Sequence, residues 1–60
     1  MNPDDERAYF NRGMSYYMLR DYPKAYLDFS KAYDLNPENE DTKKYMMHSK
    51  KMMINYKNVG

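Results

Sequence analysis

The 60-residue sequence contains no cysteine, one histidine and only two glycines. Without cysteine, the chain can form neither a disulfide nor a thiolate metal site. His48 has no second histidine nearby, so we expect no zinc or other metal site. Gly13 and Gly60 are far apart, which excludes a glycine-rich phosphate loop. Such a small chain must therefore be stabilised by close helix packing, by oligomerisation or by the remainder of a longer protein.

The sequence also lacks a long apolar run and a strong net charge. No apolar segment approaches the length of a membrane span, and the acidic first residues do not resemble a secretory signal or a transit peptide. We therefore expect a soluble, cytoplasmic protein. The formal net charge is +1, but all acids lie in residues 1–42, whereas residues 43–60 carry five lysines and no acid. These lysines have no accompanying arginine, which argues against nucleic-acid binding.

The spacing of rings and small residues predicts a first helix over about residues 4–19. Its buried stripe consists of Tyr9, Gly13 and Tyr16, and Leu19 is expected to close the stripe. An acid or amide should cap the helix and a proline suits its first turn; the candidates are Asn2, Asp4 and Pro3.

A second helix is predicted over about residues 23–35, starting at Pro23. Asn36 and Pro37 should end it, because asparagine tolerates a left-handed cap and proline cannot continue a helix. The residues expected in its buried stripe are Ala25, Phe29 and Ala32.

A third, amphipathic helix is predicted over about residues 39–57, with acids leading and lysines trailing, as the helix dipole favours. The lysines lie around Met47 and Ile54, and residues 58–60 should form a frayed tail. The opposite arc contains Tyr45, Met46, Ser49, Met52, Met53 and Tyr56. No strand pattern competes, so residues 1–60 are interpreted as a single all-α domain.

The pattern from Tyr9 to Pro37 resembles one tetratricopeptide repeat, whose length is about 34 residues. Tyr9 stands where tryptophan is commonest. Arg12 replaces the usual leucine, so it must reach solvent or find an acid. Arg20 stands where glycine often adopts a left-handed turn. If arginine keeps that conformation, it costs about 1 kcal/mol of stability. The positions that carry the family's residue type are Gly13, Tyr16, Ala25, Phe29, Ala32 and Pro37.

The resemblance implies a hairpin repeat over residues 4–37 and a capping helix over residues 38–57. Repeat arrays normally contain at least about three units. The chain is therefore either the last repeat of a longer array or a deliberately minimal unit, and both interpretations stay open.

The resemblance also implies a protein-interaction or scaffold module that binds a peptide or partner helix on the groove face of the first helix. Asn11 with Arg7 one turn earlier would suit a carboxylate ligand, but the other residues of such a clamp belong to neighbouring repeats. The family's peptide-contacting positions map to Arg7, Phe10, Asn11, Met14, Tyr17 and Met18.

Two alternatives remain beside a protein or peptide partner. The chain can be a self-assembling unit, a homodimer or helix-swapped oligomer, in which a second copy covers the apolar residues of the first helix. The third helix can also bind an anionic lipid surface, because lysines flank Met47 and Ile54. Catalysis and a cofactor are not expected, since no nucleophile lies near His48, which is interpreted as a solvated side chain.

Overall fold

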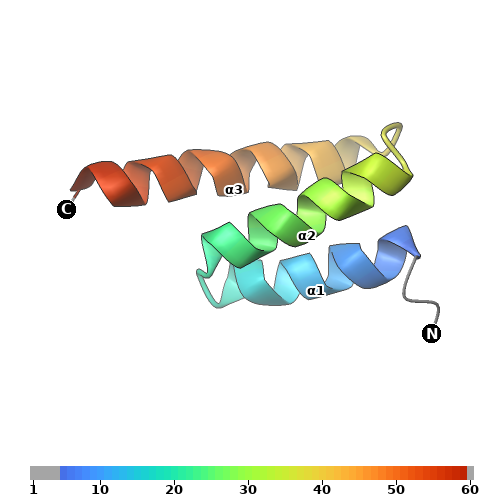
Figure 1. Ribbon diagram of the computed structural model, residues 1–60, viewed down its shortest axis with the longest axis horizontal. Helices are drawn as coiled ribbons and strands as arrows, with labels where there is room; N and C mark the ends of the chain where they lie inside the picture. The colour runs from blue at the N-terminus through green and yellow to red at the C-terminus, as the bar shows by residue number, and fades with distance from the viewer. Residues whose placement is uncertain (1–4, 60) are drawn as a thin grey trace.

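Three helices make up the computed structural model, which describes residues 5–59 and the side chains of residues 5–55 (Figure 1). They are α1 (Glu6–Met18), α2 (Tyr22–Leu35) and α3 (Glu40–Val59). The described residues contain no strand, so the predicted all-α hairpin followed by a third helix is confirmed. Residues 58 and 59 belong to α3, where no proline or glycine interrupts the helix, and the frayed tail at residues 58–60 stays a prediction.

Asp5 is the N-cap of α1, so the prediction of Asn2 or Asp4 is wrong. Its backbone is extended, with φ −78° and ψ 128°, and its Oδ1 accepts a hydrogen bond from the Arg7 backbone N–H at 2.9 Å. This is the geometry that an N-cap needs, because the side-chain oxygen must reach an N–H of the first turn. Pro3 lies outside the described residues.

The α1–α2 turn is closed by two hydrogen bonds around a left-handed residue, Arg20, whose φ is 63°. The Arg20 N–H donates to the Tyr17 carbonyl at 3.0 Å, and the Asp21 N–H donates to the Tyr16 carbonyl at 2.8 Å. This bonding pattern is a Schellman motif, which satisfies carbonyls that the end of α1 would otherwise leave free. Arg20 thus keeps the left-handed conformation that glycine often adopts at this place in the repeat.

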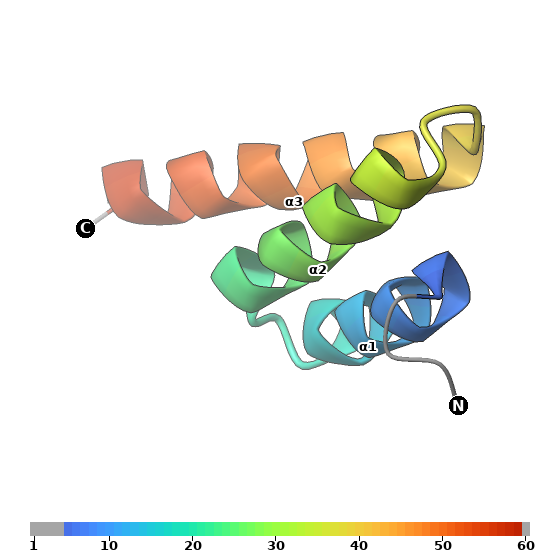
Figure 2. The same cartoon turned by 45° about the vertical axis from the view of Figure 1, so that its right-hand side comes forward.

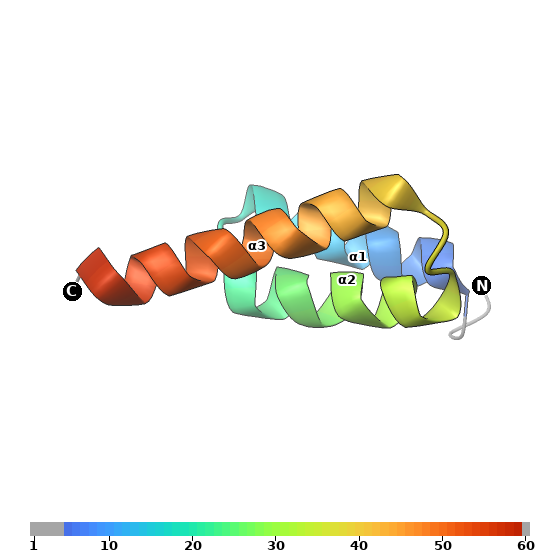
Figure 3. The same cartoon turned by 90° about the horizontal axis from the view of Figure 1, so that it is seen from above.

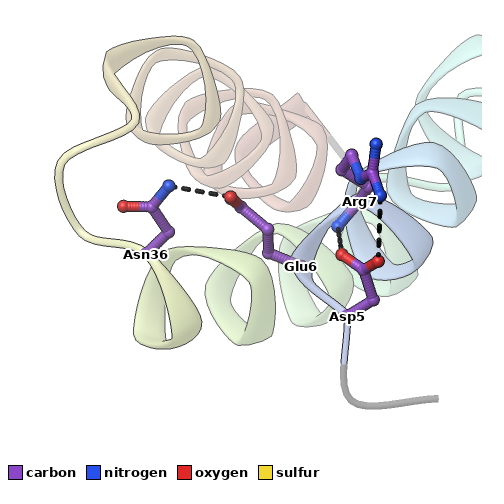
Figure 4. Close-up of polar contacts among 4 residues, drawn as sticks. All are labelled: Asp5, Glu6, Arg7 and Asn36. Carbon is purple, nitrogen blue, oxygen red and sulfur yellow. Dashed lines mark hydrogen bonds and ion pairs between the residues drawn. The ribbon is translucent and has the colours of Figure 1, made fainter. Parts of the chain in front are cut away.

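The α2–α3 loop begins at Asn36, which has an extended backbone with φ −149° and ψ 84°. The predicted left-handed cap at Asn36 is therefore wrong, because a residue before proline is pushed towards extended conformations. The Asn36 side chain instead joins two parts of the fold: Nδ2 donates to Glu6 Oε1 at 2.7 Å (Figure 4). Asn39 caps the start of α3, because its Oδ1 accepts hydrogen bonds from the Asp41 and Thr42 backbone N–H groups at 3.1 and 3.3 Å.

The core lies on α2, which packs against both other helices (Figure 2). Ala25, Phe29 and Ala32 are fully buried, as predicted, and Gly13 of α1 packs against Phe29. A Cβ at Gly13 would lie 2.9 Å from the Phe29 ring, so only glycine permits this approach of α1 to α2. Small residues thus bring the helices together around one large ring.

The rest of the predicted α1 stripe is more open than expected. Tyr9 and Tyr16 are half-buried, and Leu19 is 76% exposed rather than closing the stripe. Leu19 is the C-cap of α1, so it already belongs to the turn and no longer follows the helix face. The Arg12 guanidinium and the Lys24 ammonium each lie 5.6 Å from a ring centroid, those of Tyr9 and Tyr16 respectively.

The third helix, α3, lies along the hairpin and projects past the α1–α2 turn (Figures 1 and 3). Its buried positions are Thr42 and Ser49, while Lys43, Lys44 and the lysines at 50 and 51 are exposed. The predicted division between a packed arc and a lysine-rich side is therefore confirmed as far as Asn55. The Tyr56 side chain lies outside the described part.

Candidate functional site

The residues expected to bind a partner all lie on α1, but the structure divides them into two groups. Phe10 and Tyr17 are half-buried in contacts with other helices. The other four are Arg7, Asn11, Met14 and Met18, of which Met14 is half-buried and the rest are exposed. We call these four the open α1 face. They follow one another at helical spacing and therefore form one continuous stripe.

Phe10 and Tyr17 belong to a ring cluster that joins all three helices. Its other members are Tyr22 and Phe29 of α2 and Tyr45 of α3. The centroids of Phe10 and Tyr45 are 5.9 Å apart, and those of Tyr17 and Tyr45 are 5.5 Å apart, both in edge-to-face geometry. Aromatic pairs at these distances each contribute about 0.5–1.5 kcal/mol beyond area burial. These two side chains therefore pack against α3.

Tyr17 also forms the polar edge of the ring cluster. Its hydroxyl is hydrogen-bonded to His48 Nδ1, and burial raises the pKa of the Tyr17 phenol. His48 is exposed, as expected, and it also makes this bond to Tyr17. The sequence offered one signal for the contact: His48 follows Tyr45 by three positions, so both side chains occupy adjacent places on α3.

The open α1 face retains polar groups that a ligand can use. The Asn11 side-chain amide makes no hydrogen bond with any described residue, although its backbone carbonyl accepts from Ser15 Oγ at 3.3 Å. Arg7 Nη2 donates to Asp5 Oδ2 at 3.4 Å (Figure 4), which leaves most guanidinium donors directed to solvent because the side chain is 84% exposed. Hydrogen bonds from Arg7, first of all from its backbone N–H, lower the pKa of Asp5.

The opposite side of α1 carries an ion pair between Arg12 and Asp28. The sequence predicted that Arg12 needs solvent or an acid, but not which acid it would contact. Arg12 Nε and Nη2 donate to the two carboxylate oxygens of Asp28, each at 2.8 Å. The bonds to Asp28 raise the pKa of Arg12. Arginine thus occupies a normally apolar position by leaving its guanidinium half in solvent and by neutralising a buried carboxylate on α2.

The described residues contain neither a metal-ligating cluster nor a membrane-spanning helix. Among them, no group of three or more histidine or acidic side chains is placed to hold a metal ion. Within the same part of the chain, no helix has both the length and the apolarity to cross a bilayer. The site is therefore a surface of mixed polar and apolar side chains.

The comparison with protein families identifies the hairpin. The tetratricopeptide repeat model matches residues 6–39, which begin with α1 and end immediately before α3. No curated protein and no solved structure matches the chain. Tetratricopeptide repeats generally mediate protein–protein interactions and are typically non-catalytic. The match covers more than half of the sequence, and three helices fit one repeat followed by a capping helix. The chain belongs to the tetratricopeptide repeat family.

Proposed function

We propose that the chain is a protein-interaction module that binds a peptide or partner helix along the open α1 face. The observation that supports this most is the selective covering of α1. The ring cluster occupies Phe10 and Tyr17, whereas Met18 is 78% exposed and Asn11 is free to bond. A face with apolar and polar groups in one stripe suits partners that offer both side chains and backbone amides.

Each residue of this face has a distinct part in the proposed binding. Asn11 supplies both a donor and an acceptor, so it can bond the backbone of a bound segment. Met14 and Met18 provide unbranched, polarizable side chains that adapt to apolar groups of different shapes. Arg7 lies nearest the start of α1 and supplies charge-assisted donors to an acceptor on the ligand. Phe10 and Tyr17, which were predicted as direct contacts, support this face from below by fixing α1 against α3.

The test begins with a peptide selected from a random display library by the 60-residue chain. Asn11→Ala should weaken that peptide's affinity by about 1 kcal/mol, roughly fivefold, because a backbone hydrogen bond is lost. Leu27→Ala is the matched control, since Leu27 is also exposed but lies on α2. Equal losses in both variants, or no loss in Asn11→Ala, would contradict the proposal.

Self-association is the alternative expected from the sequence. The mass of the chain in solution distinguishes it from binding of an external partner. If a second copy covers the open α1 face, light scattering will show a mass that rises with concentration, and the selected peptide will compete with assembly. A chain that stays monomeric while it binds the peptide supports the external partner.

A further inference from the structure

Beyond its first turn, the outward side of α3 carries only positive charge, which the partner face on α1 does not explain. Its side chains are all exposed and recur at spacings of three, four and seven residues. We call it the outer α3 face, and it consists of Lys43, Lys44, Met47, Lys50, Lys51 and Ile54. The buried residues of α3, Thr42 and Ser49, occupy the opposite side. The outer face is therefore left uncovered by the hairpin.

Charge on the outer α3 face is segregated along the helix. The acids Glu40 and Asp41 stand at its first turn, and no acid follows them. The four lysines of the face have no ion-pair partner among the described residues. Positive charge is therefore carried by the part of α3 that follows its first turn. An extended anionic surface complements this arrangement better than a single acidic side chain.

Apolar side chains run along the middle of the lysine pattern. Met47 and Ile54 are one heptad apart and are 56% and 47% exposed, with lysines on both flanks. The phosphate backbone of a nucleic acid offers no apolar surface to these two side chains, whereas the boundary between lipid headgroups and acyl chains can bury them. This combination favours a bilayer over a nucleic acid.

Magnitudes also favour a bilayer over an acidic protein. Each lysine held near an anionic bilayer raises partitioning about fivefold, so four together give a gain on the order of several hundredfold. An exposed ion pair with a protein partner typically changes an equilibrium by less than about fivefold, because two side chains must be ordered in water. A flat charged surface engages all the lysines at once.

We propose that the outer α3 face binds the surface of a bilayer that contains anionic lipids. The lysines contact the headgroups, Met47 and Ile54 enter the interface, and α3 lies parallel to the membrane. This binding uses a different helix from the proposed peptide site, so the two functions are independent.

Flotation with vesicles tests the proposal directly. The 60-residue chain should float with vesicles of phosphatidylcholine and phosphatidylserine, but not with phosphatidylcholine alone, and high salt should release it. The double variant Lys50→Gln, Lys51→Gln should lower partitioning about 25-fold. The matched control is Lys24→Gln, Lys31→Gln, which removes the same charge from exposed positions of α2 and should change partitioning little.

A second pair of measurements distinguishes a bilayer from any other polyanion. Met47→Ser, Ile54→Ser should lower vesicle partitioning roughly tenfold, while binding to a short DNA duplex, if there is any, should not change. Circular dichroism of every variant reports whether α3 is retained. The proposal is overturned if wild-type chain ignores the anionic vesicles, if the α2 lysine control loses as much binding, or if the apolar substitutions have no effect on vesicles.

Discussion

Small residues are buried in both the α1–α2 interface and the α2–α3 interface, which we call the two seams, but these residues differ in polarity. In the first, Gly13 removes a side chain altogether and lets the Phe29 ring approach the α1 backbone. In the second, Thr42 and Ser49 are fully buried on α3, and their hydroxyls make no hydrogen bond with any described residue. A buried hydroxyl without a partner costs about 1–3 kcal/mol. Close approach therefore stabilises the hairpin at no polar cost, whereas the close approach of α3 leaves buried hydroxyls without partners.

Polar contacts at the edges of the two seams reinforce the difference. The first seam ends in the two-bonded Arg12–Asp28 ion pair, which joins α1 to α2 on the side away from α3. The contact of α1 with α3 is made mainly by rings, chiefly Tyr45 against Phe10 and Tyr17, and its polar contact is the Tyr17–His48 hydrogen bond. We infer that the hairpin is the better-determined unit and that α3 is held chiefly by aromatic contacts.

Phe29→Ala should have the largest effect, because Phe29 belongs to both seams. The ring is fully buried and packs against Gly13, Phe10 and Tyr45. Its removal should cost about 3–5 kcal/mol, which is comparable with the whole stability expected of a small domain. Circular dichroism should then show loss of most helical signal at room temperature. Leu27→Ala, an exposed position on the same helix, should leave the melting curve nearly unchanged.

Gly13→Ala should weaken the first seam directly, because Gly13 lies at the contact of α1 with Phe29. The new methyl would lie 2.9 Å from two Phe29 ring atoms, which are fixed in the core and cannot swing away. Overpacking of this kind costs about 1–3 kcal/mol, against which the better helix propensity of alanine returns about 1 kcal/mol. Denaturant unfolding should therefore show a net loss. Ser15→Ala is the control, because Ser15 is an exposed position of the same helix; equal behaviour of the two variants would contradict the close approach.

Much of the hairpin could be predicted from the sequence because its determinants are local. Proline at the start of α2 and alternation of rings with Ala25 and Ala32 specify the second helix within a few turns. The left-handed turn at Arg20 was also predictable, since the resemblance fixed its place in the repeat. The N-cap was harder, because several acids and amides precede α1 and any of them has the required chemistry; the backbone geometry selects Asp5.

The sequence could not predict which side chains of the candidate site are covered by other helices. Whether Phe10 and Tyr17 are free depends on where α3 lies, and α3 is separated from them by the whole of α2. The same reasoning applies to Arg12: its need for an acid followed from its position, but the choice of Asp28 required the packed hairpin. Tertiary placement therefore decided which residues of α1 remained open.

Thr42→Val should strengthen the second seam by about 1 kcal/mol. Valine has nearly the same shape as threonine but removes the buried hydroxyl that lacks a partner. Hydrogen exchange should show slower exchange of α3 amides, with smaller changes in α1. Thr42→Ser keeps the hydroxyl and loses a methyl group, so it should destabilise the chain. If valine destabilises as serine does, the hydroxyl has a bonding role and the contrast between the seams fails.

The smallest predicted effect is an acid dependence that comes from Asp5. The Arg7 backbone N–H bond lowers the pKa of Asp5 in the folded chain below its ordinary value of 3.8, so the unfolded chain binds more protons at this group. The stabilisation is therefore complete above that ordinary value and is lost as the pH falls through the lower, folded pKa. Asp5→Asn keeps a capping oxygen but cannot titrate. Its unfolding free energy, measured by urea titration across this range, should vary less with pH than that of the wild type. An unchanged acid slope would contradict the predicted contribution of Asp5.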